Sequence, residues 1–270
     1  MLNALLSIIH VDLLLWCEAA LIGILLIGAF LTSLGTSMKK MTIASGVLQS
    51  ALPVILFIAA LRVLRSLDVD AEQFFQYFGI LLLLSAITGF IWKTSRKSTL
   101  ELSRLQHIGL VAFMIGAGPA GAIPAMIHLF GQAIGHSALW YAMQRKESIA
   151  AHRGIRFSVI ALIAAMFGAP FSMLFVSELV GIGYALQAHT ALALGVFAAV
   201  VVMNILVMRR VLNFFAEPRS ESVLPMTKNE KVFTGVLAAH AVILFGAGTY
   251  LLTQPGIQFA VTVAQNIAAL

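Results

Sequence analysis

Long apolar stretches follow one another along the chain, separated by short polar segments. A helix needs roughly 20 mostly apolar residues to cross a bilayer. The spans that we predict on this basis are 12–34, 42–63, 74–92, 105–118, 122–143, 156–178, 190–212 and 232–253. The apolar tail 256–270 is too short to count as a span, and we expect it to lie along the membrane interface or to pack laterally. The pattern predicts an all-α polytopic membrane protein with about eight transmembrane helices.

Composition agrees with this pattern. Of the 270 residues, 60% are hydrophobic and 10% are charged, and the mean hydropathy is +0.98, whereas a soluble domain carries about 25% charged residues. The single cysteine, Cys17, excludes an internal disulfide and a CxxC metal or redox motif. The first residues contain no basic segment and no small-residue cleavage site, so we expect no removed signal peptide.

Basic residues concentrate at alternate connections between the predicted spans. Of the 17 lysines and arginines, all but Arg62 and Arg65 fall in the connections 35–41, 93–104, 145–156 and 209–231. Cytoplasmic loops of membrane proteins are rich in Lys and Arg. We therefore predict a multi-pass protein of the inner (cytoplasmic) membrane with both termini on the non-cytoplasmic side. The net charge of +6 is explained by these loops, and no aromatic–basic run indicates binding to nucleic acid.

The predicted span 122–143 carries three polar residues at regular spacing. His128, Gln132 and His136 stand at i, i+4 and i+8, so they form one polar stripe on a helix. An ionisable group inside the membrane indicates a functional site by default. The alternative is that these side chains only hydrogen-bond neighbouring helices. Taken alone, the stripe leaves both interpretations open.

The predicted span 156–178 contains the segment Gly168-Ala-Pro-Phe-Ser172 and ends near Glu178. A proline inside a helix removes a backbone hydrogen bond and clashes with the preceding turn, so we predict a broken helix near Pro170. Broken helices at membrane depth often line cavities and ion sites. Glu178 is then a candidate proton site near one membrane face. An ordinary proline kink with an interfacial glutamate is the alternative.

Three further ionisable residues are candidates for the same chemistry. His107 stands at the cytoplasmic end of the fourth predicted span, His240 within the eighth and Glu18 in the first. Each histidine alone is more often a packing residue, and Glu18 could instead lie at an interface with a partner. Histidine titrates near physiological pH, so a chain of such groups can relay protons.

Other chemistries fit the residues less well. Motifs of serine nucleophiles, P-loops and dinucleotide-binding sites are missing from the sequence. A zinc site built from His128 and His136 is poor, because a separation of eight residues places them about 12 Å apart along a helix. A bis-histidine haem site involving His107 or His240 is left open. We expect no catalytic centre, cofactor or metal in this chain.

Three motifs resemble one family in their order and spacing. The stripe reads His128-x3-Gln132-x3-His136-Ser-Ala-Leu, the loop-to-helix segment runs from Lys97 to Gly109 with Gln106-His107 near its end, and the break continues as Gly168-Ala-Pro-Phe-Ser-Met-Leu-Phe-Val-Ser-Glu178. These segments resemble the antiporter-like membrane subunits of complex I, multisubunit sodium/proton antiporters and group-4 membrane-bound hydrogenases. The Ser-Glu ending is most similar to the hydrogenase and formate hydrogenlyase branch.

The resemblance implies a domain organisation. Residues 1–270 form a single membrane domain, in which 1–40 add an N-terminal helix and 41–215 resemble the second half of an antiporter-like subunit. Residues 216–270 contain a loop, the last span and the short apolar tail. Family members have about fourteen spans, so this chain has room for roughly one of their two half-channels. It also has His136 where the family's central helix has a lysine.

The resemblance also implies a function. It describes a membrane subunit of a redox-linked complex in which His128, His136 and Glu178 stand on a proton (or sodium) path. Its partners are then other membrane and peripheral subunits, within the lipid bilayer. A structural scaffold subunit without its own ion path is the main alternative, because the family's lysines are missing. A haem- or quinone-binding membrane anchor is a third interpretation, and an independent small transporter is a fourth.

Overall fold

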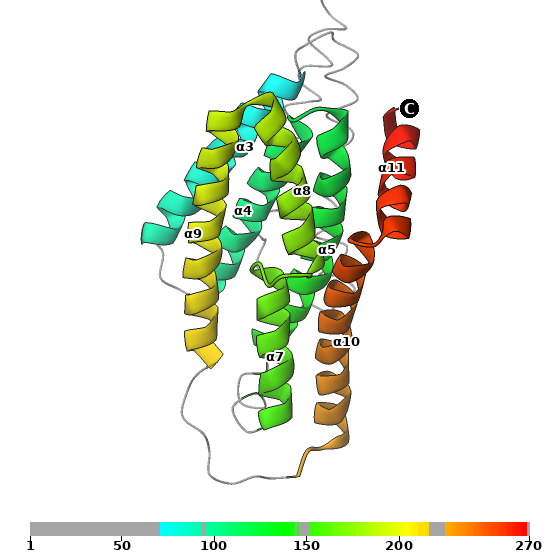
Figure 1. The fold of residues 1–270 in the computed structure, drawn as a ribbon. Helices are drawn as coiled ribbons and strands as arrows, with labels where there is room; N and C mark the ends of the chain where they lie inside the picture. The colour runs from blue at the N-terminus through cyan, green and yellow to red at the C-terminus, as the bar shows by residue number, and fades with distance from the viewer. Residues whose placement is uncertain are drawn as a thin grey trace, which may run out of the picture.

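The computed structural model of the protein describes residues 71–92, 96–143, 145, 149, 152–215 and 225–268. Within these residues the regular structure is entirely helical (Figure 1), which confirms the predicted fold class for this part of the chain. The helices are α3 (Ala71–Trp92), α4 (Arg96–Ile115), α5 (Pro119–Met143), α7 (Arg153–Met166), α8 (Met173–Ala188), α9 (Thr190–Phe215), α10 (Lys228–Leu251) and α11 (Gln254–Ala268). The first two predicted spans and Glu18 lie outside the described residues.

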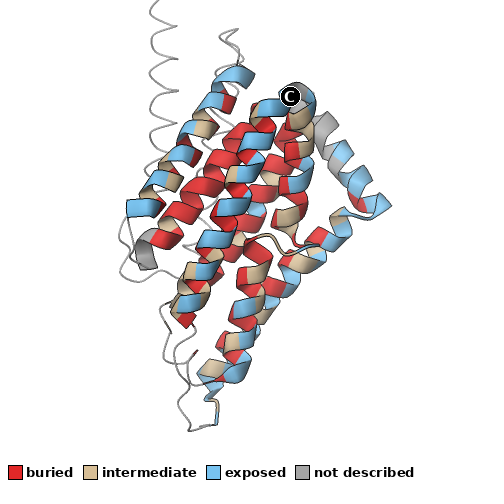
Figure 2. Ribbon diagram, turned by 60° about the vertical axis from the view of Figure 1, so that its left-hand side comes forward, coloured by how far each residue is buried: buried red, intermediate tan, exposed pale blue. Residues whose placement is uncertain are grey.

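The exterior of the described bundle is apolar. Figure 2 shows exposed positions on the outward faces of the helices and buried positions toward the centre. Large apolar side chains stand exposed on these faces, including Trp92, Phe157 and Val242. Three segments, Glu72–Trp92, Thr190–Phe215 and Lys228–Leu251, are long and apolar enough to cross a membrane. The described chain is therefore a multi-pass membrane protein, while the total of eight spans stays a prediction.

Helix α4 lies at the centre of the bundle and contacts α3, α5, α8 and α9. Its middle carries Ser103, Arg104, Gln106 and His107, all buried. The predicted span 105–118 is too short and is shifted, because α4 begins at Arg96 and ends at Ile115. These polar side chains face protein rather than lipid, so hydropathy alone does not detect this part of the helix. His107 is consequently near the middle of α4 and not at its end.

The predicted break near Pro170 is confirmed. Figure 1 shows α7 and α8 end to end, with their connection about midway along the bundle. The connection needs two residues with positive φ, Gly168 at 94° and Phe171 at 68°. Such values suit glycine and are strained for other residues. Ser172 then starts α8, and its hydroxyl accepts a hydrogen bond from the Phe175 amide at 3.2 Å.

The predicted end of this span near Glu178 is wrong. Helix α8 continues from Met173 to Ala188, because the segment after Glu178 is again apolar and holds no proline. Glu178 therefore lies inside the bundle, within two turns of the break. It does not mark the end of a helix at a membrane face.

Helix α10 packs closely against the break. A Cβ atom added at Gly248 would stand 2.2 Å from the carbonyl oxygen of Phe171, so only glycine permits this approach. The apolar tail, expected to lie along the interface or pack laterally, forms α11, which follows a turn at Leu252–Thr253 and contacts α5 and α10. The tail thus packs laterally against the described bundle.

Basic side chains gather at one end of the described bundle. The C-terminal end of α9 and the N-terminal ends of α7 and α10 all lie at the lower end in Figure 1. These ends carry Arg153, Arg156, Arg209, Arg210, Lys228 and Lys231. Two of the four predicted basic connections, 145–156 and 209–231, thus meet at one end of the described structure, and the connection 35–41 lies outside the described residues. That this end faces the cytoplasm remains a prediction.

Candidate functional site

The site is built from two pairs of neighbouring residues on two facing helices. Gln106 and His107 are adjacent on α4, and Ser177 and Glu178 are adjacent on α8; all four are buried. Consecutive residues of an α-helix point about 100° apart. One member of each pair therefore reaches α5, and the other member reaches α9.

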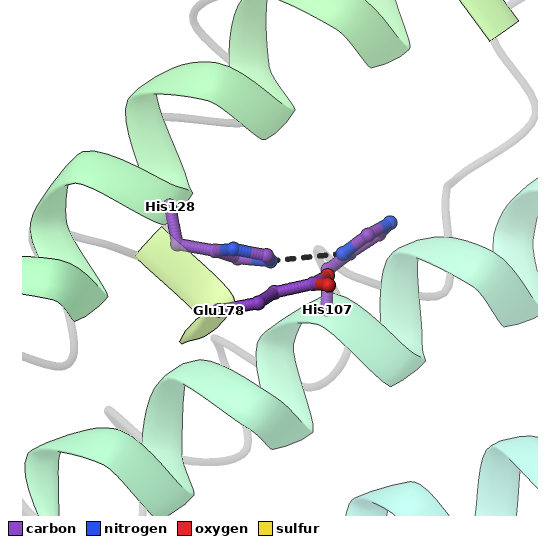
Figure 3. Close-up of side chains that lie close together, drawn as sticks. All are labelled: His107, His128 and Glu178. Carbon is purple, nitrogen blue, oxygen red and sulfur yellow. Dashed lines mark hydrogen bonds between the residues drawn. The ribbon is translucent and has the colours of Figure 1, made fainter. Parts of the chain in front are cut away.

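The arm toward α5 is a chain of hydrogen bonds through two imidazoles. His107 Nδ1 and His128 Nε2 are 2.9 Å apart, and Figure 3 marks this hydrogen bond with a dashed line. His128 Nδ1 is 2.9 Å from the hydroxyl oxygen of Ser177. That hydroxyl in turn donates to the carbonyl of Leu174 at 2.8 Å. Three helices are thereby linked through side chains that are almost completely withdrawn from solvent.

The hydroxyl of Ser177 determines the direction of this chain. A hydroxyl has one proton, and here it is given to Leu174, so Ser177 accepts the next bond from His128 Nδ1–H. A neutral imidazole has one donor and one acceptor nitrogen. His128 Nε2 is then an acceptor, and His107 Nδ1–H donates to it. With both rings neutral, His107 Nε2 is left as a buried acceptor with no hydrogen-bond partner among the described residues.

The arm toward α9 ends at the carboxylate of Glu178. The Nε2 amide of Gln106 donates to Asn204 Oδ1 at 2.7 Å. Asn204 Nδ2 points to both carboxylate oxygens of Glu178, at 3.5 and 3.4 Å. These contacts are long, and a buried carboxylate requires strong partners to offset its lost hydration. Glu178 is therefore a weakly held acidic group in the interior of the bundle.

The two arms meet in a cluster of three side chains. Donor atoms of His107, His128 and Glu178 all lie within 4.8 Å of one another. Figure 3 shows the carboxylate of Glu178 beside the hydrogen bond that joins the two rings. The ring of Phe167, at the end of α7, stands 6.2 Å from the ring of His107. The helix break therefore lies directly next to the cluster.

The rest of the predicted stripe is buried but stands outside this cluster. Gln132 Nε2 donates to the backbone carbonyl of Arg104 at 3.3 Å. His136 is 4% exposed, and its Nδ1 has no hydrogen-bond partner within the described part of the chain. His240 is half-buried on α10, and its Nδ1 lies 2.7 Å from the carbonyl of Val236 in its own helix. The structure brings His107, His128 and Glu178 together and leaves Gln132, His136 and His240 apart from them.

The sequence pattern assigns no role to three members of the network. Ser177 stands in the motif that ends at Glu178, Gln106 lies beside His107, and both are buried. Asn204 is the third. The sequence does indicate this residue, because Asn204 is a single amide within the apolar run Val201-Val-Met-Asn-Ile-Leu206, and a polar group inside the membrane is costly.

Comparison with known proteins supports the fold of the bundle. No protein-family model matches the chain, and no curated protein matches it either. Among solved structures, the chain is similar to a chain in the structure of the Mrp complex from Dietzia sp. DQ12-45-1b, with 18% sequence identity and a TM-score of 0.60. The match covers 85% of this chain and 53% of that one, so this protein spans about half the length of its structural relative. The two proteins share a membrane fold.

Proposed function

We propose that this protein is a membrane subunit of an ion-translocating complex and that a proton path runs through His107, His128 and Glu178. The observation that carries the proposal is the pair of buried hydrogen-bonded arms, spread over four helices, that meet where an acidic group stands within 4.8 Å of two imidazoles. Intramembrane ionisable groups of this kind form proton relays in pumps and transporters. The shared fold with a chain of the Mrp complex, together with the sequence motifs, supports an antiporter-like subunit.

The hydrogen bonds give the relay a defined order. A proton taken up at His107 Nε2 allows the proton on Nδ1 to pass to His128 Nε2. His128 then carries protons on both nitrogens, while Ser177, which gives its own proton to Leu174, holds the ring in place as an acceptor. His107 has accepted on one nitrogen and released from the other, which is the basis of proton shuttling by histidine. Glu178 exchanges protons with either ring through one bridging water across the remaining separation.

The other predicted path residues extend the proposal. Gln132 and His136 continue the polar stripe along α5, away from the cluster, and His136 offers a buried nitrogen for a further step. Glu18 and His240 remain candidates on other segments. The Ser177-Glu178 ending resembles the hydrogenase branch of the family, so we propose that electron transfer in partner subunits drives the translocation. No redox group is proposed for this chain.

Proton translocation by the intact complex in sealed vesicles tests the path. We expect His128→Ala to lower the translocation rate by roughly tenfold or more, because a positioned proton-transfer group contributes at least this much. His136→Ala tests the proposed extension along α5. A suitable control is His152→Ala, which removes a histidine paired with Glu230 at 3.2 Å at the basic end of the bundle.

Assembly of the complex and its uncoupled turnover are measured in the same preparations. Loss of translocation with assembly and turnover retained supports the path. Translocation equal to wild type in both His128→Ala and His136→Ala would instead favour the scaffold function, in which the chain holds its partners without conducting ions.

A further inference from the structure

The cluster of His107, His128 and Glu178 has the donor atoms of a metal site. We propose that it binds a divalent transition metal of the zinc class, and that the bound ion blocks the proton path. The block depends on the function proposed above, whereas the binding itself does not. The three side chains come from three different helices, α4, α5 and α8, and are at most 8% exposed.

The kinds of donor atom select the class of metal. Two imidazole nitrogens and one carboxylate oxygen suit zinc and similar divalent ions, which use such three-residue sets with an open fourth position. Magnesium and calcium prefer all-oxygen sites, and soft ions such as Cu(I) prefer sulfur ligands, which this cluster lacks. A zinc-class ion is therefore the best chemical match.

The distances require only a small adjustment. Zinc–ligand bonds of about 2.0–2.2 Å in tetrahedral geometry place neighbouring ligand atoms roughly 3.4 Å apart. The two ring nitrogens, at 2.9 Å, are already close to this separation. The donor atoms of the cluster lie within 4.8 Å of one another. Glu178 therefore needs a shift of at most about 1.4 Å, and its only hydrogen bonds in the described structure are the two long ones from Asn204.

The surroundings already orient one ligand. A metal-bound histidine nearly always donates its second ring N–H to an oxygen, which fixes the tautomer and the ring orientation. His128 Nδ1 has such a partner in Ser177, at 2.9 Å. This hydrogen bond leaves His128 Nε2 directed toward the cluster with its lone pair available.

The second imidazole must exchange its tautomer. In the metal-free arrangement His107 Nδ1–H donates to His128 Nε2. Binding through Nδ1 moves that proton to Nε2, with no net proton released from the ring. His107 Nε2 has no hydrogen-bond partner in the described structure, so this exchange breaks no bond at Nε2. The ion replaces the proton that the two rings otherwise share, and this stops the relay.

Binding is tested with Co²⁺ and Zn²⁺ alone, added to the purified, metal-stripped complex. We expect a visible absorption band of four- or five-coordinate Co²⁺, displaced by Zn²⁺. We expect His107→Gln and Glu178→Gln, which keep side chains of similar size, each to weaken Co²⁺ binding by roughly tenfold or more. His152→Ala is the matched control, because His152 and Glu230 form another histidine–carboxylate pair, and its removal should leave the band unchanged.

Each outcome decides a separate part of the proposal. Three results overturn the metal site and leave the proton path standing. They are a cobalt band that is absent from the wild type, one that is unchanged in both cluster variants, and one that is lost in His152→Ala. Binding at the cluster with no effect of Zn²⁺ on wild-type translocation overturns the block alone. Zinc inhibition of wild-type translocation, together with loss of the cobalt band in the cluster variants, supports both parts. Melting temperatures without metal identify variants that fail to fold, and for these His128→Asn is the replacement.

Discussion

At the scale of single residues, one hydroxyl sets the donor-to-acceptor direction of the hydrogen-bond chain. Ser177 donates to the carbonyl of Leu174 and so must accept from His128. This orients the ring of His128 and, through it, the ring of His107. The serine is thus a positioning residue in the proposed relay, since it selects which nitrogen of His128 carries a proton.

Ser177→Ala removes the hydroxyl that fixes which nitrogen of His128 carries the proton. We expect His128 to lose its single tautomer, which ¹⁵N NMR of labelled histidine detects as a change in the shifts of the ring nitrogens. Proton translocation should fall as well, because the chain loses its defined order. Ser137→Ala is the matched control: Ser137 is also buried and also donates to a carbonyl three residues earlier, Ile134. Unchanged nitrogen shifts in Ser177→Ala would contradict the assignment.

Residue identities also show what the sequence alone can predict. The spacing of His128, Gln132 and His136 correctly predicted that all three are buried on one helix. It could not show that only His128 meets His107, because that contact depends on how α4 and α5 pack. Asn204 and Gln106 gain their roles from a contact with each other, although the two residues are 98 positions apart in the chain. Periodicity within one helix carries no information on such a pair.

At the scale of elements, the break between α7 and α8 decides where the acidic group lies. Because α8 begins anew at Met173, Glu178 falls in its second turn and reaches the middle of the bundle. The sequence predicted the break from Pro170, since proline has a fixed local effect. It could not predict where α8 ends, because both lipid-facing and protein-facing helices continue through apolar residues.

Gly168→Ala tests the conformation of this break. The positive φ of Gly168 is strained for any residue with a Cβ, and we expect the free energy of unfolding to fall by about 1–2 kcal/mol. Gly183→Ala on α8 is the control: a Cβ there meets no atom within 4 Å, and alanine favours the helix. Denaturant unfolding in detergent measures both. Equal stability changes in the two variants would show that the break does not need its glycine.

At the scale of the whole molecule, polar and apolar surfaces are inverted relative to a soluble protein. The described bundle exposes large apolar side chains and encloses a network of polar side chains. Hydropathy predicted the membrane location well, because the outward faces dominate the average. It failed for α4, whose polar residues face the interior. The same burial makes the network suitable for holding protons away from solvent.

The protein also spans only about half of its structural relative. The proposed proton path runs through the buried network of the described bundle. The central claim is therefore that protons cross this chain through Glu178 and its neighbours while it is assembled in a complex.

Proton translocation by the assembled complex with Glu178→Gln tests this claim most directly. Glutamine keeps the size of the side chain but cannot exchange a proton, so we predict a loss of roughly tenfold or more in translocation rate, with assembly and uncoupled turnover retained. The control is Glu72→Gln, which changes an exposed carboxylate at the start of α3 and should leave translocation unchanged. Wild-type translocation in Glu178→Gln would contradict the account.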